Sequence, residues 1–298
     1  MPAAPLRGRF VWHELTTHDP DAAARFYPGL TGWKVEPYAD NPSYRLWTMG
    51  GVPMGGLMVL PDEQRRAGTP PYWLCYMGAP DVDATVRQAT SLGARVVVAP
   101  QTIPVGRFAV LADPQGAVFA LYRPSQEPMG NDEAGVGDFS WHELATTDPA
   151  AAQKFYRALF GWEHASSFEM GPGDTYWMFK RGGGTKTLGG IYKKRPEMTA
   201  PPNWLPYVRV ASADKAAAAA GRTGGKVLIG PMDVPGGDRI AMCIDPQGAA
   251  FAVHTVMAQA TTTRPKPSRK PVKPKRKVTK PKAKAKPRRA KAKAKRRR

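Results

Sequence analysis

Two glutamates stand in the same short motif, which occurs twice in the chain. Glu14 follows Trp12 by two positions, and Glu143 follows Trp141 by two positions. Side chains two apart on an extended strand point to the same face, so each carboxylate is expected to lie beside an indole ring. Partial desolvation there raises the carboxyl pKa and suits it to accept a proton or a hydrogen bond. Glu14 and Glu143 are therefore the candidate catalytic residues, and they are also candidate ligand contacts.

Aromatic and basic side chains form the rest of the candidate site. Trp73 and Trp204 also recur between the two halves, and Trp47 belongs to a neighbouring predicted strand. Aromatic rings in a concave pocket bind flat or apolar ligands by stacking, whereas the alternative is that they pack a core. An arginine could pair with each glutamate and hold the cleft together. The candidate ligand-binding residues are Trp12, Glu14, Trp47, Trp73, Arg107, Trp141, Glu143, Trp204 and Arg239.

Histidine and cysteine are expected to have structural roles. His13 and His142 adjoin the tryptophans in sequence, so they should point to the opposite face, towards the helices. His254 is interpreted as a polar wall residue of the cleft. Cys75 and Cys243 lie in hydrophobic strands, where a buried, unreactive thiol is expected. The sequence suggests no Ser-His-Asp or Cys-His pair.

An internal repeat sets the elements that position these residues. The motif from Trp12 to Pro20 recurs 129 positions later, and Asp113-Pro114-Gln115-Gly116 recurs 132 positions later as Asp245-Pro246-Gln247-Gly248. This small drift indicates two copies of one domain. Within each copy, a strand, a helix begun by Asp and ended by Gly, and three short strands follow one another twice. The predicted domains span 8–123 and 138–257, with a linker at 124–137 and a tail at 261–298.

The motifs also carry a family resemblance. The first half contains W-x-E-L-x-T-x-D-P-x-A-A-x-x-F-Y-x-x-L-x-G-W, then D-V-D-A followed by L-G-A, then G-R-F-A-V-x-x-D-P-Q-G-A. This pattern resembles the vicinal oxygen chelate superfamily, which includes glyoxalases, extradiol dioxygenases and bleomycin-resistance proteins. The resemblance covers residues 8–257. It implies an α+β fold of two tandem domains, in each of which two βαβββ modules form a curved sheet around a cleft.

The same resemblance implies where a metal ion would be held. Metal-dependent members place His, Gln or Glu on the first strand of each module, and a Glu near the end of the last strand. Counting from the helix-starting aspartates and from the Asp-Pro-Gln-Gly motifs puts Trp12, Trp73, Trp141, Trp204, Ala120 and Ala252 at these positions. An indole N–H can only donate and alanine has no donor atom, so we expect no metal ion and no cofactor.

The charge of the chain is confined to its tail. Residues 261–298 contain 20 of the 44 Lys and Arg and no Asp or Glu, so 24 basic and 24 acidic residues remain elsewhere. A flexible polycation binds DNA or RNA by releasing counterions, without reading sequence. The candidate nucleic-acid residues are Lys266, Arg269, Lys270, Lys273, Lys275, Arg276, Lys277, Arg288, Arg289, Arg296, Arg297 and Arg298.

These observations favour a cytoplasmic protein, with nucleoid association through the tail. Only two cysteines, no signal peptide and no membrane-spanning stretch are found in the sequence. The expected function is binding of a small aromatic or apolar molecule by a monomer or homodimer, with non-specific nucleic-acid binding by the tail and no membrane contact. One alternative is a lyase or dioxygenase with non-standard metal ligands, such as Glu14 with a histidine. The other is a nucleoid-associated protein whose folded body is a scaffold.

Overall fold

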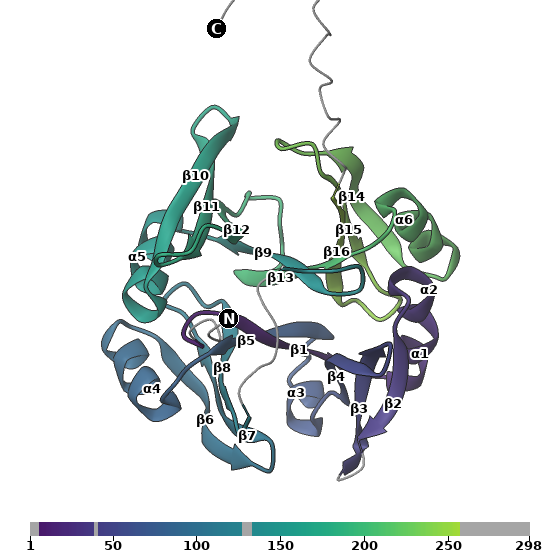
Figure 1. Cartoon of the computed structure of the whole chain (residues 1–298), viewed down its shortest axis with the longest axis horizontal. Coiled ribbons are helices and arrows are strands. Elements are labelled where there is room, and N and C mark those ends of the chain that lie inside the picture. Colours follow the sequence, from purple (N-terminus) through teal and green to yellow (C-terminus); the bar gives the residue numbers. More distant parts are fainter. Residues whose placement is uncertain (1–5, 39–40, 127–132, 257–298) are drawn as a thin grey trace, which may run out of the picture. The chain divides into compact units, whose positions relative to one another are not determined.

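The computed structural model describes residues 6–38, 41–126 and 133–256 (Figure 1). Each sequence repeat forms one eight-stranded sheet. The first sheet contains β1 (Phe10–Thr17), β2 (Lys34–Tyr38), β3 (Asn41–Met49), β4 (Val52–Val59), β5 (Tyr72–Gly78), β6 (Arg95–Ile103), β7 (Gly106–Ala112) and β8 (Val118–Pro124). The second contains β9 (Phe139–Thr146), β10 (Trp162–Gly171), β11 (Asp174–Arg181), β12 (Thr187–Lys193), β13 (Asn203–Arg209), β14 (Lys226–Asp233), β15 (Arg239–Ile244) and β16 (Ala250–Thr255).

The strand order shows the paired modules directly. It is β2-β3-β4-β1-β5-β8-β7-β6 in the first sheet and β10-β11-β12-β9-β13-β16-β15-β14 in the second. The first strand of a module runs parallel to the module's fourth strand, as β1 does beside β4, and the two modules meet at the antiparallel pair β1–β5 or β9–β13. The predicted α+β class, with two βαβββ modules in each sheet, is confirmed.

Helices follow the first strand of each module, as predicted from the capping residues. They are α1 (Pro20–Phe26), α2 (Pro28–Thr31), α4 (Val82–Ser91), α5 (Pro149–Phe160) and α6 (Ala213–Arg222). One further helix, α3 (Asp62–Arg66), lies between β4 and β5, where the two modules of the first domain are joined. Asp19 caps α1 by accepting from the N–H groups of Asp21 and Ala22, and Gly32 ends α2 with a left-handed φ of 80°. The first repeat has two short helices where the second has one, because Pro28 lacks the N–H that would continue the α1 ladder.

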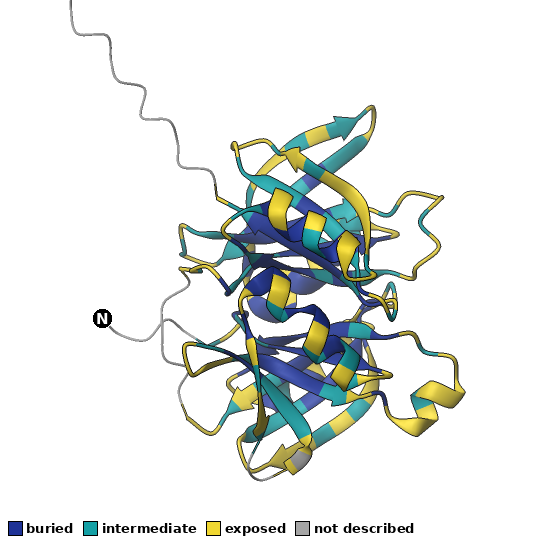
Figure 2. Ribbon diagram, turned by 90° about the vertical axis from the view of Figure 1, so that its right-hand side faces the viewer, coloured by how far each residue is buried: buried dark blue, intermediate teal, exposed yellow. Residues whose placement is uncertain are grey.

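The two domains share their cores. One cluster joins β5, α4, β7 and β8 of the first domain with β9, α5 and β11 of the second. The other joins β1, α1 and α2 of the first domain with β13, α6, β15 and β16 of the second. Figure 2 shows these buried segments in dark blue between the sheets. The helix-bearing face of each sheet therefore lies inside the molecule, and its other face is turned outward.

Hydrogen bonds cross between the domains in equivalent pairs. Trp73 donates to the Tyr27 hydroxyl at 3.0 Å, and Tyr27 donates to the carboxylate of Asp245 at 3.1 Å. The equivalent bonds elsewhere in the interface join Trp204 to the Tyr156 hydroxyl and Tyr156 to Asp113, at 3.0 Å each. The aspartate of each Asp-Pro-Gln-Gly motif thus accepts from a tyrosine of the other domain.

Two histidines meet at the centre of this interface. The Nε2 atoms of His13 and His142 lie 2.7 Å apart, and both side chains are buried. Phe10 stacks on His142 with ring centroids 3.5 Å apart, and Phe139 stacks on His13 at 3.7 Å. Since the Nδ1 of His142 is within 3.3 Å of the Leu188 carbonyl, it donates there, and its Nε2 accepts from His13. Both histidines therefore point away from the cleft face, as predicted, but they contact each other between the two domains, whereas the sequence predicts contact with a helix.

The remaining predictions about the body concern thiols and membrane segments. Cys75 and Cys243 are free and buried, and burial raises the pKa of the Cys243 thiol to about 11 and that of Cys75 further. Neither thiol is therefore ionised near neutral pH, as expected. No helix among the described residues has the length and apolar character needed to cross a membrane.

Candidate binding clefts

The outward face of the first sheet carries Glu14 together with an aromatic cluster. Leu74 and Tyr76 on β5 and Ala120 on β8 are buried there, and Trp12, Tyr72, Phe108 and Tyr122 pack against them. Glu14 is paired with Leu74, and Tyr76 with Ala120, so these side chains share one face of the sheet. Trp12 and Glu14 therefore lie on the cleft side, as the sequence predicts.

Two tyrosine hydroxyls hold the Glu14 carboxylate. Tyr44 on β3 donates to Oε2 at 2.7 Å, and Tyr76 donates to Oε1 at 3.1 Å. The Trp12 indole N–H in turn donates to the Tyr44 hydroxyl at 3.1 Å. Glu14 itself is only 8% exposed. The result is a fixed carboxylate whose oxygens each keep a lone pair for a further donor.

A glycine makes the approach of Tyr44 to Glu14 sterically possible. A Cβ on Gly56 of β4 would lie 1.9 Å from the Tyr44 hydroxyl oxygen and 3.3 Å from Cγ of Glu14. In the second domain, a Cβ on Gly190 would lie 2.0 Å from the ring of Tyr176. Any side chain at these positions would displace the tyrosine, so the glycines are part of the site.

The second domain builds the same arrangement around Glu143. Trp141 donates to the Tyr176 hydroxyl, and Tyr176 donates to Oε1 of Glu143, both at 2.8 Å. The Tyr207 hydroxyl is close enough to lower the pKa of Glu143, but neither it nor Glu143 Oε2 has a partner with regular hydrogen-bond geometry. Tyr207 thus stands beside Glu143 as Tyr76 stands beside Glu14, and its hydroxyl is the second phenol that faces this carboxylate.

Electrostatics at both glutamates follow from burial. Desolvation raises the pKa of Glu14, and the hydrogen bonds from Tyr44 and Tyr76 lower it in part. The pKa of Glu143 is raised for the same reason and is lowered in part by Tyr207 and Tyr176. With no cation among these contacts, each carboxyl is poised to accept a hydrogen bond or a proton from a ligand.

Three of the expected cleft tryptophans are in the core instead, and this prediction is wrong. Trp73 pairs with Leu15, a core residue, so its side chain points to the helix face and bonds to Tyr27. Trp204 is placed equivalently, and Trp47 packs in the same core cluster as Trp73. Leu74, one residue further on, is the β5 residue that faces the cleft opposite Glu14.

The two arginines are also absent from the clefts. Arg107 forms a two-pronged ion pair with Asp83 of α4, at 2.6 and 2.7 Å, on the helix side of the sheet. Arg239 binds Asp214 of α6 in the same way, at 2.7 and 2.9 Å. The expectation that they line the cleft, or pair there with the glutamates, is therefore wrong. Each arginine ties a helix to its own sheet.

Sequence reasoning missed four tyrosines that complete the sites. Tyr44 and Tyr176 are 132 positions apart, and Tyr76 and Tyr207 are 131 apart, so both pairs recur at the offsets of the repeat. Tyr76 also stands two residues after Leu74, on the same strand face. The repeat offsets alone could have identified these residues as members of the sites.

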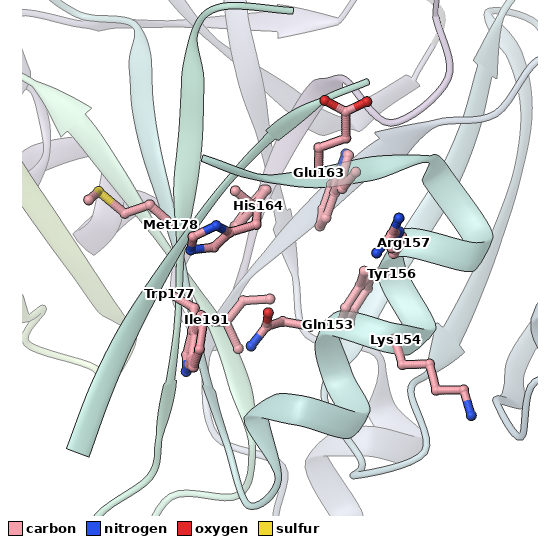
Figure 3. A pocket seen from close by; sticks show the side chains of 11 residues that line it. Gln153, Lys154, Tyr156, Arg157, Glu163, His164, Trp177, Met178 and Ile191 are labelled. Carbon is pink, nitrogen blue, oxygen red and sulfur yellow. The ribbon is translucent and has the colours of Figure 1, made fainter. Parts of the chain in front are cut away.

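A surface pocket lies on the helix side of the second sheet, away from the clefts. It is bounded by α5 and by the β10–β11 hairpin, with Gln153, His164 and Trp177 converging on it (Figure 3). In the first repeat, Val35 and Arg45 occupy the places of His164 and Trp177. The candidate nucleic-acid residues of the tail lie outside the described residues.

Comparison with known proteins relates both halves of the chain to one superfamily. Residues 12–122 match the family described as glyoxalase-like domain, and residues 139–253 match the glyoxalase/bleomycin resistance protein/dioxygenase superfamily. The chain is 35% identical to the protein named "Putative glyoxylase CFP32" of Mycobacterium tuberculosis, over 81% of this chain and 92% of that protein. It is 32% identical to the anthracycline biosynthesis protein DauV of a Streptomyces species, over 83% and 92% respectively.

Solved structures show the same fold at low identity. A Mn(II)-bound glyoxalase from Novosphingobium aromaticivorans matches with a TM-score of 0.57 and 14% identity, over 84% of this chain and 82% of that one. The 2,2',3-trihydroxybiphenyl 1,2-dioxygenase of Sphingomonas wittichii matches with a TM-score of 0.60 and 15% identity, over 84% and 91%.

Proposed function

Because the chain belongs to the glyoxalase/bleomycin resistance protein/dioxygenase superfamily, as a tandem two-domain member, we propose that each domain binds a small organic molecule in its cleft. The ligand is aromatic and donates a hydrogen bond to the buried glutamate. The observation that carries this proposal is the Trp-Tyr-Glu-Tyr arrangement on the outward face, with Glu14 held by Tyr44 and Tyr76. Aromatic walls favour a flat molecule, and the carboxylate favours one with a hydroxyl group.

The residues around the cleft centre do not fit a divalent metal ion. Trp12 on β1, Gly56 on β4, Leu74 on β5 and Ala120 on β8 surround Glu14. None of these side chains has a lone pair for a cation, and a lone carboxylate held by tyrosines is not a metal cage. Across the described ranges, no three His, Cys, Asp or Glu side chains converge to hold an ion. This composition supports a role that does not use the metal of related enzymes.

The alternative metal site of Glu14 with a histidine is not favoured. His13 lies on the opposite face of β1 from Glu14, with its Nε2 on His142. In the second domain, His254 is on the cleft side, but its two ring nitrogens contact Ser140 and Asp238. A metal ion at either glutamate would therefore find one carboxylate and, among the described residues, no histidine or cysteine beside it.

Relatives named for anthracycline biosynthesis narrow the ligand class. Anthracyclines are fused aromatic rings with phenolic hydroxyls. A ring system of this kind would lie against Trp12 and Phe108 while a hydroxyl donates to Glu14. We therefore take hydroxylated polycyclic aromatics as the ligand class, and hydroxyanthraquinones as suitable probes.

The test compares two probes and three proteins. 1,2-Dihydroxyanthraquinone is titrated against the protein, with thermal unfolding and calorimetry as readouts, and unsubstituted anthraquinone serves as the matched probe without a donor. At 100 times Kd, binding adds about 2.7 kcal/mol to the free energy of unfolding. The double variant Glu14→Gln, Glu143→Gln should bind the dihydroxy probe at least about tenfold more weakly, since a charge-assisted hydrogen bond contributes roughly 1.5–3 kcal/mol. The variant Arg107→Ala, on the opposite sheet face, should bind normally. Equal affinity for the two probes, or undiminished binding by the glutamine variant, would contradict the proposal.

The tail adds a second binding activity to this proposal. Its 20 basic residues without an acidic one favour sequence-independent contact with DNA or RNA, which would hold the protein at the nucleoid. For 6–10 phosphate contacts, affinity for duplex DNA should fall by about 10³–10⁵ between 50 and 200 mM salt. A variant that ends at residue 260 should bind neither DNA nor RNA, but its clefts should bind the anthraquinone probe with unchanged affinity. DNA binding that is insensitive to salt, or that survives removal of 261–298, would refute the assignment.

A further inference from the structure

The second cleft contains a hydrogen-bonded chain of serine, histidine and aspartate. Ser140 Oγ lies 2.9 Å from Nδ1 of His254, and His254 Nε2 lies 2.9 Å from Oδ2 of Asp238. Ser140 and Asp238 are partly exposed, whereas His254 is 8% exposed. This series of hydrogen bonds therefore begins at Asp238 on the solvent edge of the cleft, passes through the buried imidazole of His254 and ends at the Ser140 hydroxyl.

Backbone geometry places the serine on the cleft side. Phe139 pairs with Val208 and Trp141 pairs with Tyr207, so Ser140 is an extra residue on β9 and forms a β-bulge. His254 follows Ala252 by two residues on β16 and thus shares its strand face, while Val253 points into the core. Ser140 consequently lies next to Trp141, the residue that begins the network around Glu143.

The hydrogen-bond partners fix the direction of the proton. A carboxylate only accepts, so His254 Nε2 carries the hydrogen towards Asp238. In the neutral imidazole, Nδ1 is then the acceptor, and the Ser140 hydroxyl donates to it at 2.9 Å. The other acceptor near Ser140 is the Tyr207 carbonyl at 3.4 Å, a longer and weaker contact. A serine hydroxyl bonded to a basic nitrogen whose far side is oriented by a carboxylate is an activated nucleophile.

The first domain lacks this chemistry at the same places. The repeat puts Val11 where the second domain has Ser140, and Tyr122 where it has His254. The Tyr122 hydroxyl donates to the Val105 carbonyl at 2.7 Å and so helps to hold the loop between β6 and β7. In the second domain, the contact between His254 and Asp238 holds the loop between β14 and β15. A tyrosine holds the equivalent loop of the first domain, so this structural role does not explain the presence of an imidazole or of Ser140.

We propose that the second cleft is a site of acyl transfer, in which Ser140 attacks the carbonyl carbon of a small aromatic ester. Ser140 Oγ forms a bond to that carbon and its proton passes to His254 Nδ1. The ester C–O bond then breaks, and the leaving alcohol takes the proton from His254. Water repeats the sequence on the acyl-serine and releases the carboxylic acid. Asp238 keeps the imidazole in the required tautomer throughout. This activity goes beyond the proposed binding role and does not depend on the ligand class assigned to the clefts.

The experiment uses the full chain, a covalent probe and a chromogenic ester. Diisopropyl fluorophosphate should phosphorylate Ser140, forming the Oγ–P bond with loss of fluoride and the serine proton, and peptide mass spectrometry should locate the label there. The protein should also hydrolyse p-nitrophenyl acetate. Ser140→Val, which introduces the residue found at the equivalent position of the first domain, should remove both reactions. Asp238→Asn should slow both by about 10⁴-fold because the tautomer is lost.

Two controls make the result decisive. Ser167→Ala changes an exposed serine of β10 and should leave labelling and hydrolysis unchanged. Circular dichroism and affinity for the anthraquinone probe show that each variant is folded and that its clefts are formed, so a failure of catalysis is distinguishable from a failure of binding. A protein that binds the aromatic probe but gains no label at Ser140, or hydrolyses the ester as fast in the Ser140→Val variant, overturns the proposal.

Discussion

The histidine pair between the domains makes a specific prediction about stability in acid. His13 and His142 are buried with their Nε2 atoms 2.7 Å apart, and rings of Phe10 and Phe139 cover their outer faces. One N–H···N bond joins the two neutral imidazoles, whereas a proton added to the pair would be a buried cation. Burial lowers the pKa of His142 to about 3, and burial together with the neighbouring His142 lowers that of His13 well below its usual value.

The sign and size of the effect follow from these pKa values. Histidine in an unfolded chain has a pKa of about 6.5, so the unfolded protein takes up protons that the folded protein refuses. The stabilising contribution is full above pH 6.5 and declines as the pH falls towards 3. At pH 5, about 1.5 units below the unfolded pKa, the loss is about 2 kcal/mol for His142, and His13 adds a loss of the same sign.

Urea unfolding at pH 8 and pH 5 measures this loss. The double variant His13→Gln, His142→Gln keeps two groups that can bond to each other but do not titrate. Its free energy of unfolding should fall less between the two pH values than that of the parent, by at least about 2 kcal/mol. Buried carboxyls such as Glu14, whose raised pKa acts with the opposite sign, are present in both proteins and cancel in the difference. His18→Gln, at an exposed position, should behave as the parent does. If parent and double variant lose the same free energy, the pair is not held neutral and the argument fails.

Three substitutions test the assignment of residues to cleft, core and surface. Gly56→Ala should abolish binding in the first cleft by displacing Tyr44, whose hydroxyl lies 1.9 Å from the new Cβ, and calorimetry should show the number of sites falling from two to one. Trp73→Phe should lower the free energy of unfolding in urea by about 1–3 kcal/mol, because the core loses ring volume and the hydrogen bond to Tyr27. Ligand affinity should not change, and weaker binding would show that Trp73 contributes to the cleft. Arg107→Ala should leave the urea midpoint almost unchanged, since its ion pair with Asp83 is exposed to solvent, and a clear drop of the midpoint would mean that the pair does more than fasten α4.

The fold was predictable because the repeat and the helix caps are local signals. Asp19 and Asp148 begin helices, and Gly32 and Gly161 end them, at the positions that the sequence indicates. The placement of Trp12 and Glu14 was predictable for the same reason, since strand alternation next to a recognised helix start leaves little freedom. Burial of both cysteines follows from their hydrophobic surroundings.

The second module shows where such reasoning fails. Counting back seven residues from Asp19 reaches Trp12, and the same count from the cap Asp81 reaches Leu74, one residue after Trp73. A shift of one residue moves a strand side chain to the other face, so the error carried Trp73 from core to cleft. Conspicuous recurrence of a tryptophan did not indicate which face it occupies. The recurrence of Tyr76 two residues beyond Leu74 was less conspicuous and more informative.

Arg107 and Asp83 illustrate a second limit. A strand residue and a helix residue 24 positions apart become partners only once the helix is laid across the sheet, and no local pattern contains that distance. The Ser140 chain has the same character, because its members come from β9, β16 and the turn before β15. Sites assembled from several elements need the topology before their chemistry can be recognised.

The two repeats are alike in the residues that join the domains and differ in residues that line the clefts. Where the domains face each other, equivalent residues keep equivalent partners: Tyr27 bonds to Asp245 as Tyr156 bonds to Asp113. A change there would have to be matched in the other domain, because each bond crosses between the two. On the outward faces the hydrogen bonds around Glu14 and around Glu143 stay within one domain, and the second domain has Ser140 where the first has Val11. Residues of the shared core are therefore constrained by both domains, whereas residues of each cleft are constrained by one domain only. The two clefts of this protein should differ most at the β7–β8 and β15–β16 ends.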